Sequence, residues 1–251
     1  SIIQIGGLEA ESPIDASVRL ALNEQPRDAF IAACMVMRSL AHFDRFNLKD
    51  SRQRCEETRR TMLDELSRFS GHHGYLRAQA VVEAADGGCE NVFEATVLWI
   101  VKSLYSGRVL TQFPITIEDH TYFGDIVLPD LKVIIEPDGR TKFGDNEQEV
   151  RDSTGKWLAR QHDLTNAGWR VVRVRWQDTE NLVAFRTGIA AQLRIEPADD
   201  AAVTSPVGRA STTACTPQQT KNSQVVAVPY RYVSVGRRPT SMPRDDSPCR
   251  A

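Results

Sequence analysis

Two short apolar segments with acids at their ends constrain the fold of this chain more than any other feature. Asp125 opens the first segment, and Glu136 and Asp138 lie at the end of the second, with the turn-forming residues 129–132 between them. This pattern predicts a β-hairpin. Because strand side chains alternate between faces, Glu136 and Asp138 project from the same side of the sheet, and the hairpin brings Asp125 beside them.

Three carboxylates at one hairpin end would repel one another and raise each other's pKa. A folded protein tolerates such a group mainly when a cation or a basic side chain neutralises it, and carboxylate oxygens suit Mg²⁺ or Mn²⁺. We therefore predict a divalent metal site held by Asp125 and Glu136. The alternative is that these acids lie at the end of a hairpin and face water.

The segments around this hairpin predict a mixed α+β unit over residues 88–195. We expect strands at 109–118, 121–128, 132–137 and 170–176, with helices at 94–105 and 155–167. This order gives a helix, a three-stranded meander, a helix and a last strand that returns beside the hairpin. Trp169 and Trp176, at the two ends of the last strand, are expected to be buried against these helices.

The remainder of the chain divides into two further parts. Residues 1–87 read as a helical region, and Ser1 together with the residues after it suggests an N-terminally trimmed fragment. The expected helices are one that starts at Ser12-Pro13 and three more at about 26–40, 51–69 and 75–85. Residues 196–251 are predicted to be a disordered tail, because they are rich in Ser, Thr and Pro and lack periodicity.

The composition excludes several classes of protein. Five scattered cysteines without a C-x-x-C pair argue against a disulfide framework and a thiolate zinc site, and they fit a reducing cytoplasm. No apolar run approaches the ~18–20 residues of a membrane helix, and no signal peptide opens the sequence. We expect a cytoplasmic protein without membrane contact.

The net charge of −2 argues mildly against a nucleic-acid binder, but the basic residues are not spread evenly. They concentrate in the second half of the predicted α+β unit, at Arg151, Lys156, Arg160, Arg170, Arg173 and Arg175. Arg173 and Arg175 alternate with apolar residues, which puts both on one face of the last strand. That face either contacts a phosphate backbone or is an ordinary solvated surface.

These motifs resemble the PD-(D/E)-x-K nuclease superfamily over roughly residues 88–185. The resemblance is to its branch related to very-short-patch-repair endonucleases, which many actinobacterial proteins carry behind a helical region like that of abortive-infection antitoxins. The matching motifs are Asp125…Glu136-x-Asp138-Gly139, Glu90–Glu94 before an apolar helix, Arg140–Phe143, and the helix, Gly-Trp turn and strand of residues 160–176.

The resemblance implies a restriction-endonuclease-like fold and a Mg²⁺-dependent (or Mn²⁺-dependent) hydrolysis of DNA phosphodiesters. Asp125 and Glu136 would hold the ion, and Asp138 would help to bind or position the attacking water. Glu94 would approach from the first helix as an outer ligand or a base. The ion would polarise the scissile phosphate.

Basic side chains would complete such a site. Lys142 or Arg160 would offset the charge that develops on the phosphate, and His162 would serve as a general base or a phosphate contact. The expected DNA-binding residues are Arg140, Lys142, Arg160, Arg173 and Arg175.

The chain also departs from the family pattern. Pro137 stands where the family more often has an aromatic or aliphatic residue, and Gln161 stands where it has an acid. Asp138 replaces the lysine of the wider superfamily, as in this branch. Two alternatives to an active enzyme therefore stay open. One is a non-catalytic DNA-binding regulator, such as an antitoxin that binds DNA or a cognate toxin, and the other is a purely structural interaction protein.

Overall fold

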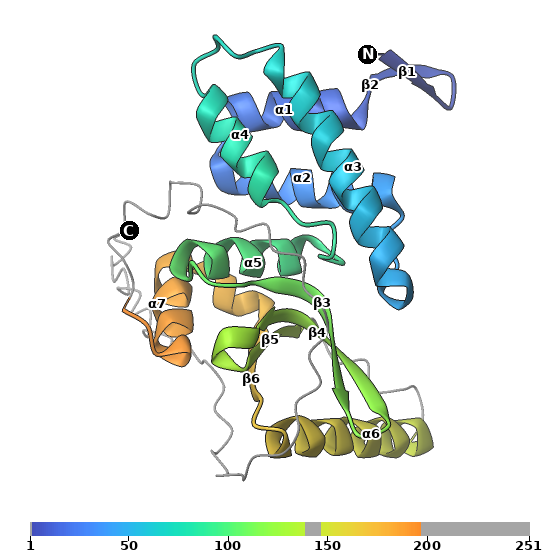
Figure 1. Cartoon of the computed structure of the whole chain (residues 1–251), viewed down its shortest axis with the longest axis vertical. Helices are drawn as coiled ribbons and strands as arrows, with labels where there is room; N and C mark the ends of the chain where they lie inside the picture. The colour runs from blue at the N-terminus through green and yellow to red at the C-terminus, as the bar shows by residue number, and fades with distance from the viewer. Residues whose placement is uncertain (1, 139–146, 197–251) are drawn as a thin grey trace, which may run out of the picture.

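A computed structural model describes residues 2–138 and 147–196, with only the backbone of Ile5 and of residues 147–154. It is a mixed α+β protein, as the sequence predicted. Figure 1 shows a helical layer stacked on helix α5 (Val92–Leu104), with a four-stranded sheet beyond it. The predicted tail from residue 197 onwards lies outside the described residues.

The N-terminal layer contains the four helices that the sequence predicted: α1 (Pro13–Asn23), α2 (Pro26–Ala41), α3 (Leu48–Ser67) and α4 (Tyr75–Ala84). The start of α1 follows from its sequence, since Ser12 accepts a hydrogen bond from the Asp15 N–H at 3.2 Å. The apolar faces of the four helices meet in a common core that includes Phe30, Met37 and Met62.

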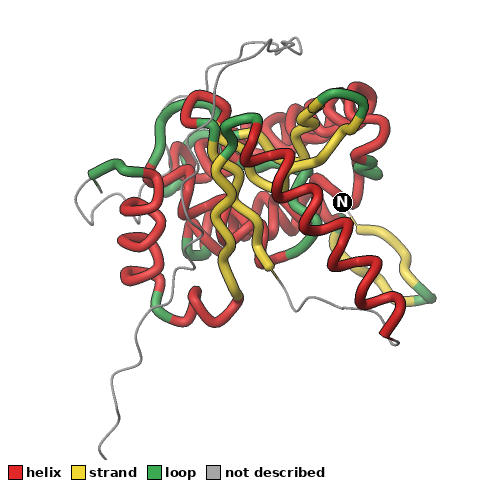
Figure 2. Tube along the Cα trace, turned by 90° about the horizontal axis from the view of Figure 1, so that it is seen from below, coloured by secondary structure: helices red, strands yellow, loops and turns green. Residues whose placement is uncertain are grey.

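A two-stranded hairpin that the sequence did not predict precedes these helices. Strands β1 (Ile2–Ile5) and β2 (Leu8–Glu11) pair antiparallel through a turn in which Gly6 and Gly7 have φ of 58° and 83°. Four-residue strands carry too little alternation to be recognised from sequence. The hairpin projects away from the helices in both views (Figures 1 and 2).

The second unit has the predicted order of elements. After α5 come β3 (Leu110–Ile117), β4 (His120–Leu128), β5 (Val133–Asp138), α6 (Glu147–Asn166) and β6 (Arg170–Arg175). The strand order is β3-β4-β5-β6, with β6 parallel to β5 and the other pairs antiparallel. The last strand therefore returns beside the hairpin. Helix α6 begins at Glu147 rather than near residue 155, and α7 (Leu182–Leu193) was not predicted.

The sheet is covered on both faces. One set of alternate side chains, such as Ile126 and Ile135, packs in the large core together with α5 and α7. The intervening set, such as Val127 and Ile134, packs in a smaller cluster with Leu164 of α6. Figure 2 shows α6 crossing in front of the strands on this second side. Side chains that continue the second set toward the strand ends therefore face α6.

Helix α5 joins the two parts of the molecule. All nine residues from Phe93 to Val101 are buried, because the sheet covers one side of the helix and the N-terminal helices cover the other. Phe30 of α2 contacts Trp99 of α5, with ring centroids 5.2 Å apart. The N-terminal helices and the sheet unit consequently share one hydrophobic core.

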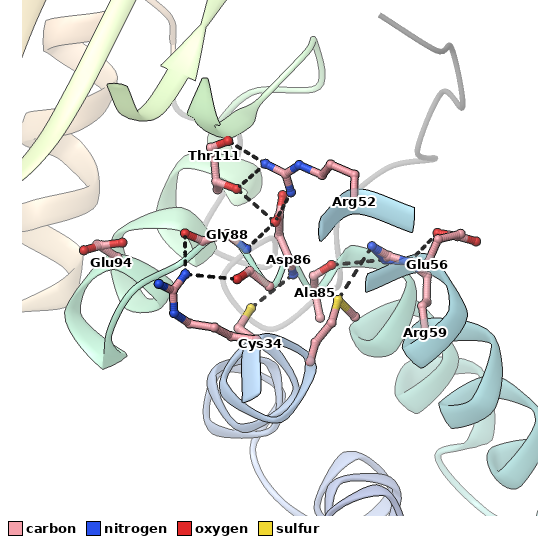
Figure 3. Close-up of polar contacts among 12 residues, drawn as sticks. Cys34, Arg52, Glu56, Arg59, Ala85, Asp86, Gly88, Glu94 and Thr111 are labelled. Atoms are coloured by element: carbon pink, nitrogen blue, oxygen red, sulfur yellow. Dashed lines mark hydrogen bonds and ion pairs between the residues drawn. The ribbon is translucent and has the colours of Figure 1, made fainter. Parts of the chain in front are cut away.

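A cluster of hydrogen-bonded polar groups lies at the same junction between the N-terminal helices and the sheet unit (Figure 3). Arg52 of α3 donates from Nη1 to Asp86 Oδ1 at 2.6 Å and from Nη2 to Thr111 Oγ1 of β3 at 2.9 Å. Asp86 Oδ1 also accepts from the Gly88 N–H at 2.8 Å and from Thr111 Oγ1 at 2.9 Å. Burial opposes ionisation of Asp86, but the nearby charges of Arg52 and Lys102 hold the pKa of its carboxyl below the usual range.

The prediction that both tryptophans of the last strand are buried is wrong for Trp176. Trp169 is partly buried and packs on the smaller cluster, whereas Trp176 is 51% exposed and contacts Phe93 edge-on, with centroids 5.4 Å apart. The reason is that β6 ends at Arg175, and Trp176 begins a 3₁₀ turn that leaves the sheet. Among the helices of the described ranges, none is long and apolar enough to cross a membrane.

Candidate active site

The hairpin register brings Asp125 and Glu136 to the same place. Ile126 pairs with Ile135, and one further residue along each strand sets Asp125 opposite Glu136. Opposite residues of an antiparallel pair project from the same face. By the alternation described above, this is the face that packs on α6.

Both carboxylates line an open cleft of about 470 Å³. Its walls come from β4, the end of β5, α6, β6 and the short 3₁₀ turn Arg45–Asn47 of the helical region. The lining residues are Arg45, Phe46, Thr121, Tyr122, Phe123, Asp125, Glu136, Pro137, Asp138, Arg160 and Arg173.

Two arginines neutralise Glu136, which is only 6% exposed. Arg173, itself 7% exposed, lies directly across the parallel β5–β6 pair, with Nη2 2.9 Å from Glu136 Oε2. Arg160 of α6 forms an ion pair with Oε1, although this buried oxygen accepts no hydrogen bond from the described residues. Arg173 also lies 3.6 Å from Asp138 Oδ2, and its guanidinium stacks over the ring of Trp157. The face of β6 at Arg173 is therefore a buried ion-pair network and not a solvated surface.

Asp125 has a different environment from Glu136, because the hydrogen bond described for its carboxylate comes from an amide side chain. Gln112 of β3 lies between Thr111 and Phe113, whose partners in β4 flank Asp125, and it donates from Nε2 to Asp125 Oδ1 at 3.3 Å. Burial, reinforced by the neighbouring Glu136 carboxylate, raises the pKa of Asp125 to about 6. Gln112 is fully buried and has a φ of 45°, a strained conformation for a residue other than glycine. Sequence analysis missed Gln112, since an isolated amide in a strand carries no motif.

Glu94 lies in the first turn of α5 and takes part in starting that helix. Its Oε2 accepts from the Glu90 N–H at 2.6 Å and its Oε1 from Asn91 Nδ2 at 2.8 Å, while Asn91 caps the helix by accepting from the Glu94 N–H. Burial, opposed by the hydrogen bond from the Glu90 N–H and reinforced by the charge of Asp125, raises the pKa of Glu94 to about 7. Glu94 is thus a buried carboxyl that exchanges its proton near neutral pH.

Asp125 and Glu136 are the two cleft carboxylates that would hold a divalent cation, if one binds here. Within the described ranges, no group of three or more His, Cys, Asp or Glu side chains is arranged as metal ligands. Mg²⁺, however, is commonly bound by one or two carboxylates and completes its coordination with water and phosphate oxygens. Asp125 and Glu136 offer that number on one face. Burial first, and the charge of Glu136 second, raise the pKa of Asp125, and a bound cation would act against both by favouring the carboxylate.

Of the other predicted site residues, some lie at the cleft and some do not. Asp138 lines the cleft, whereas His162 is exposed on α6, where its Nδ1 lies 3.0 Å from Asn166 Nδ2. Arg175 is exposed and lies 3.8 Å from Asp178. Arg140 and Lys142 fall outside the described residues.

The two departures from the family pattern have local explanations. Pro137 lacks an N–H and lies opposite Val174 within the pairing of β5 with β6, but the described pairing of β5 with β4 has ended at Ile135, so no bond of the β4 ladder is lost. Gln161 accepts a hydrogen bond from Arg173 Nη2 at 3.4 Å. An amide at this position still contacts the arginine that binds Glu136.

Arg45, Phe46 and Phe123 are cleft residues that sequence analysis did not select. Two of them come from the helical region, which showed no motif of its own. A scan of protein-family models and searches of curated proteins and of solved structures found no match to this chain.

Proposed function

We propose that this protein is a metal-dependent endonuclease that hydrolyses DNA phosphodiester bonds. The observation that supports the proposal is the placement of Asp125 and Glu136 side by side in an open cleft that also contains Arg160 and Arg173. Carboxylates for a cation and guanidinium groups for a phosphate are the two requirements of phosphodiester hydrolysis. The resemblance to the PD-(D/E)-x-K superfamily, which rests on the same acids, agrees with this proposal.

In this proposal Asp125 and Glu136 hold the ion, Mg²⁺ or Mn²⁺. When bound, such an ion lowers the pKa of a coordinated water and polarises the phosphate. Asp138, at the same end of β5, would orient the water. Glu94 would act from behind Asp125, since a carboxyl with a pKa of about 7 accepts or donates a proton at neutral pH.

The two arginines would have different tasks. The Arg173 side chain is 8% exposed and holds Glu136 from inside the sheet, so it positions a ligand. The Arg160 side chain is 24% exposed at the cleft wall, which leaves it accessible to a substrate phosphate. On this basis we assign to Arg160 the stabilisation of the negative charge that develops on the phosphate in the transition state.

The test is plasmid cleavage by the full chain across a Mg²⁺ and Mn²⁺ titration. Asp125→Asn and Glu136→Gln keep the side-chain size and remove the charge, so each should abolish cleavage. Asp64→Asn and Glu57→Gln alter exposed acids of α3 in the same way and should leave cleavage unchanged. Calorimetric titration of Mn²⁺ gives a second readout, in which Asp125→Asn should weaken binding. Cleavage that survives Glu136→Gln would place the chemistry elsewhere.

A non-catalytic DNA-binding regulator, such as an antitoxin with a cognate toxin, is the second candidate function. The pairing of Glu136 with both Arg160 and Arg173 favours it, because two guanidinium groups already neutralise this carboxylate without a cation. A regulator would bind DNA without cleaving it at any Mg²⁺ concentration. Glu136→Gln would then change its affinity only modestly.

A further inference from the structure

An aromatic side chain of the helical region lines the cleft beside strand β4. Phe46 belongs to the 3₁₀ turn Arg45–Asn47 and is 78% exposed, although it is a large apolar residue at the rim of a charged cleft. Its ring meets that of Phe123 of β4 in an edge-to-face contact, with centroids 5.7 Å apart and an interplanar angle of 79°. The contact holds the Phe46 ring against a wall of the cleft that Asp125 and Glu136 also line, while most of the side chain stays exposed to water.

Arg45 adds a charge to the same place. Its guanidinium carbon lies 5.3 Å from the centroid of the Phe46 ring and 6.0 Å from that of Phe123. It also forms an ion pair with Glu90 at 3.5 Å. The turn itself is held by Asp44, which accepts a hydrogen bond from the Phe46 N–H at 2.9 Å. Two phenyl rings and a guanidinium are thus presented together on an ordered backbone.

This combination is suited to an unpaired nucleobase. Bases stack on exposed aromatic side chains, and nearby arginines add cation–π attraction and pair with the phosphates on either side. A base inside a duplex is already stacked between its neighbours, so it cannot cover Phe46 without leaving the helix. The cleft, at about 470 Å³, has the size of pockets that enclose small ligands, on the order of 300–1,000 Å³.

We propose that Phe46 and Phe123, with Arg45, form a stacking platform for an unpaired base of single-stranded DNA that enters the carboxylate cleft. The inference rests on the proposed function and deepens it by naming the substrate class. The helical region would then supply part of the substrate site, and the enzyme would favour single strands over intact duplex.

The experiment measures binding of the full chain to a fluorescent single-stranded oligonucleotide of about 12 nucleotides, within the usual site sizes of such grooves. The same sequence as a blunt duplex is measured in parallel, both without divalent ions so that nothing is cleaved. Phe46→Ala should weaken single-strand binding about 5- to 150-fold, which is the range expected for the loss of one stacked base. The same substitution should weaken duplex binding by less than about twofold, because a paired base does not stack on Phe46. Phe46→Trp keeps a stacking ring and should bind like the wild type.

Phe69→Ala is the matched control, since Phe69 is 41% exposed and lies just beyond the end of α3, in the helical region but outside the cleft lining. It should leave both affinities unchanged. Unaltered single-strand binding by Phe46→Ala, or an equal loss on both DNA forms, would overturn the stacking platform while leaving the nuclease proposal intact. A wild type that neither binds nor cleaves any DNA form would overturn both.

Discussion

Replacement of Asp86 by Asn tests whether the junction between the helical region and the sheet holds the molecule together. The carboxylate accepts three hydrogen bonds at one oxygen, from Arg52, Gly88 and Thr111. Asn keeps the size of the side chain but removes the charge that compensates Arg52. The substitution therefore leaves a guanidinium at the junction without its carboxylate.

The magnitude follows from how deeply the pair is buried. Breaking a buried ion pair by removing one partner costs about 3–5 kcal/mol. The Arg52 side chain is 37% exposed, against 15% for Asp86, so water can solvate part of the orphaned charge. We expect Asp86→Asn to lower the free energy of unfolding by about 2–4 kcal/mol at pH 7.

The pH dependence has a defined sign. The pKa of Asp86 is lower in the folded protein than in the unfolded chain, where it is about 3.9. Its contribution is therefore complete above the unfolded value and is lost as the pH falls toward the folded value. The stability difference between the wild type and Asp86→Asn should shrink below roughly pH 4.

Urea unfolding, followed by circular dichroism and by the fluorescence of the tryptophans, measures these differences. Trp99 of α5 is buried where the two parts meet, so both probes should report one transition. Asp64→Asn, an exposed change of the same type on α3, should lie within ~0.5 kcal/mol of the wild type. A cost below ~1 kcal/mol for Asp86→Asn, or a difference that grows in acid, would refute the reasoning.

Two further stability predictions concern the same region and the first turn of α5. Gly88→Ala should destabilise the protein by about 1–3 kcal/mol in urea unfolding, because a Cβ there would overlap Thr111 Oγ1, whereas Gly71→Ala, with no atom within 4 Å, should not. Since burial raises the pKa of Glu94 to about 7, the wild type should lose stability relative to Glu94→Gln as the pH rises from about 4 through 7. A difference that stays flat over that range would contradict the buried, protonated state of Glu94.

The fold was predictable where the sequence signal is local. The acid-tipped hairpin, the helix start at Ser12 and the apolar run of α5 each depend on neighbouring residues, and the structure has each of them. The strand order followed because a meander and one helical crossover leave few alternatives. Helix α7 was missed although Asn181 caps it. Trp176 was misjudged because β6 ends in a local turn, in which Asp178 Oδ2 accepts a hydrogen bond from the Arg175 N–H at 2.8 Å.

The site was less predictable, because its contacts join distant parts of the chain. Glu136 faces Arg173 only because β5 and β6 pair in parallel with this register. Arg45 and Phe46 reach the cleft only because the helical region packs on α5. No spacing in the sequence encodes either arrangement. The sequence identified the acids but could not show that arginines already neutralise one of them.

The charges of the cleft bear on how a chain with a net charge of −2 could bind DNA. Its described lining contains three acids, Asp125, Glu136 and Asp138, and three arginines, so the formal charges cancel. A DNA phosphate that enters therefore gains little net electrostatic attraction. It would also have to compete with Glu136 for the Arg160 side chain. A divalent cation at Asp125 and Glu136 would shift the balance by two positive charges and free Arg160 for the phosphate. In the proposed enzyme, metal and DNA therefore bind with positive coupling, each raising the affinity for the other. A regulator whose arginines stay on Glu136 would show no such coupling, which makes the metal dependence of DNA affinity a more direct discriminator than cleavage alone.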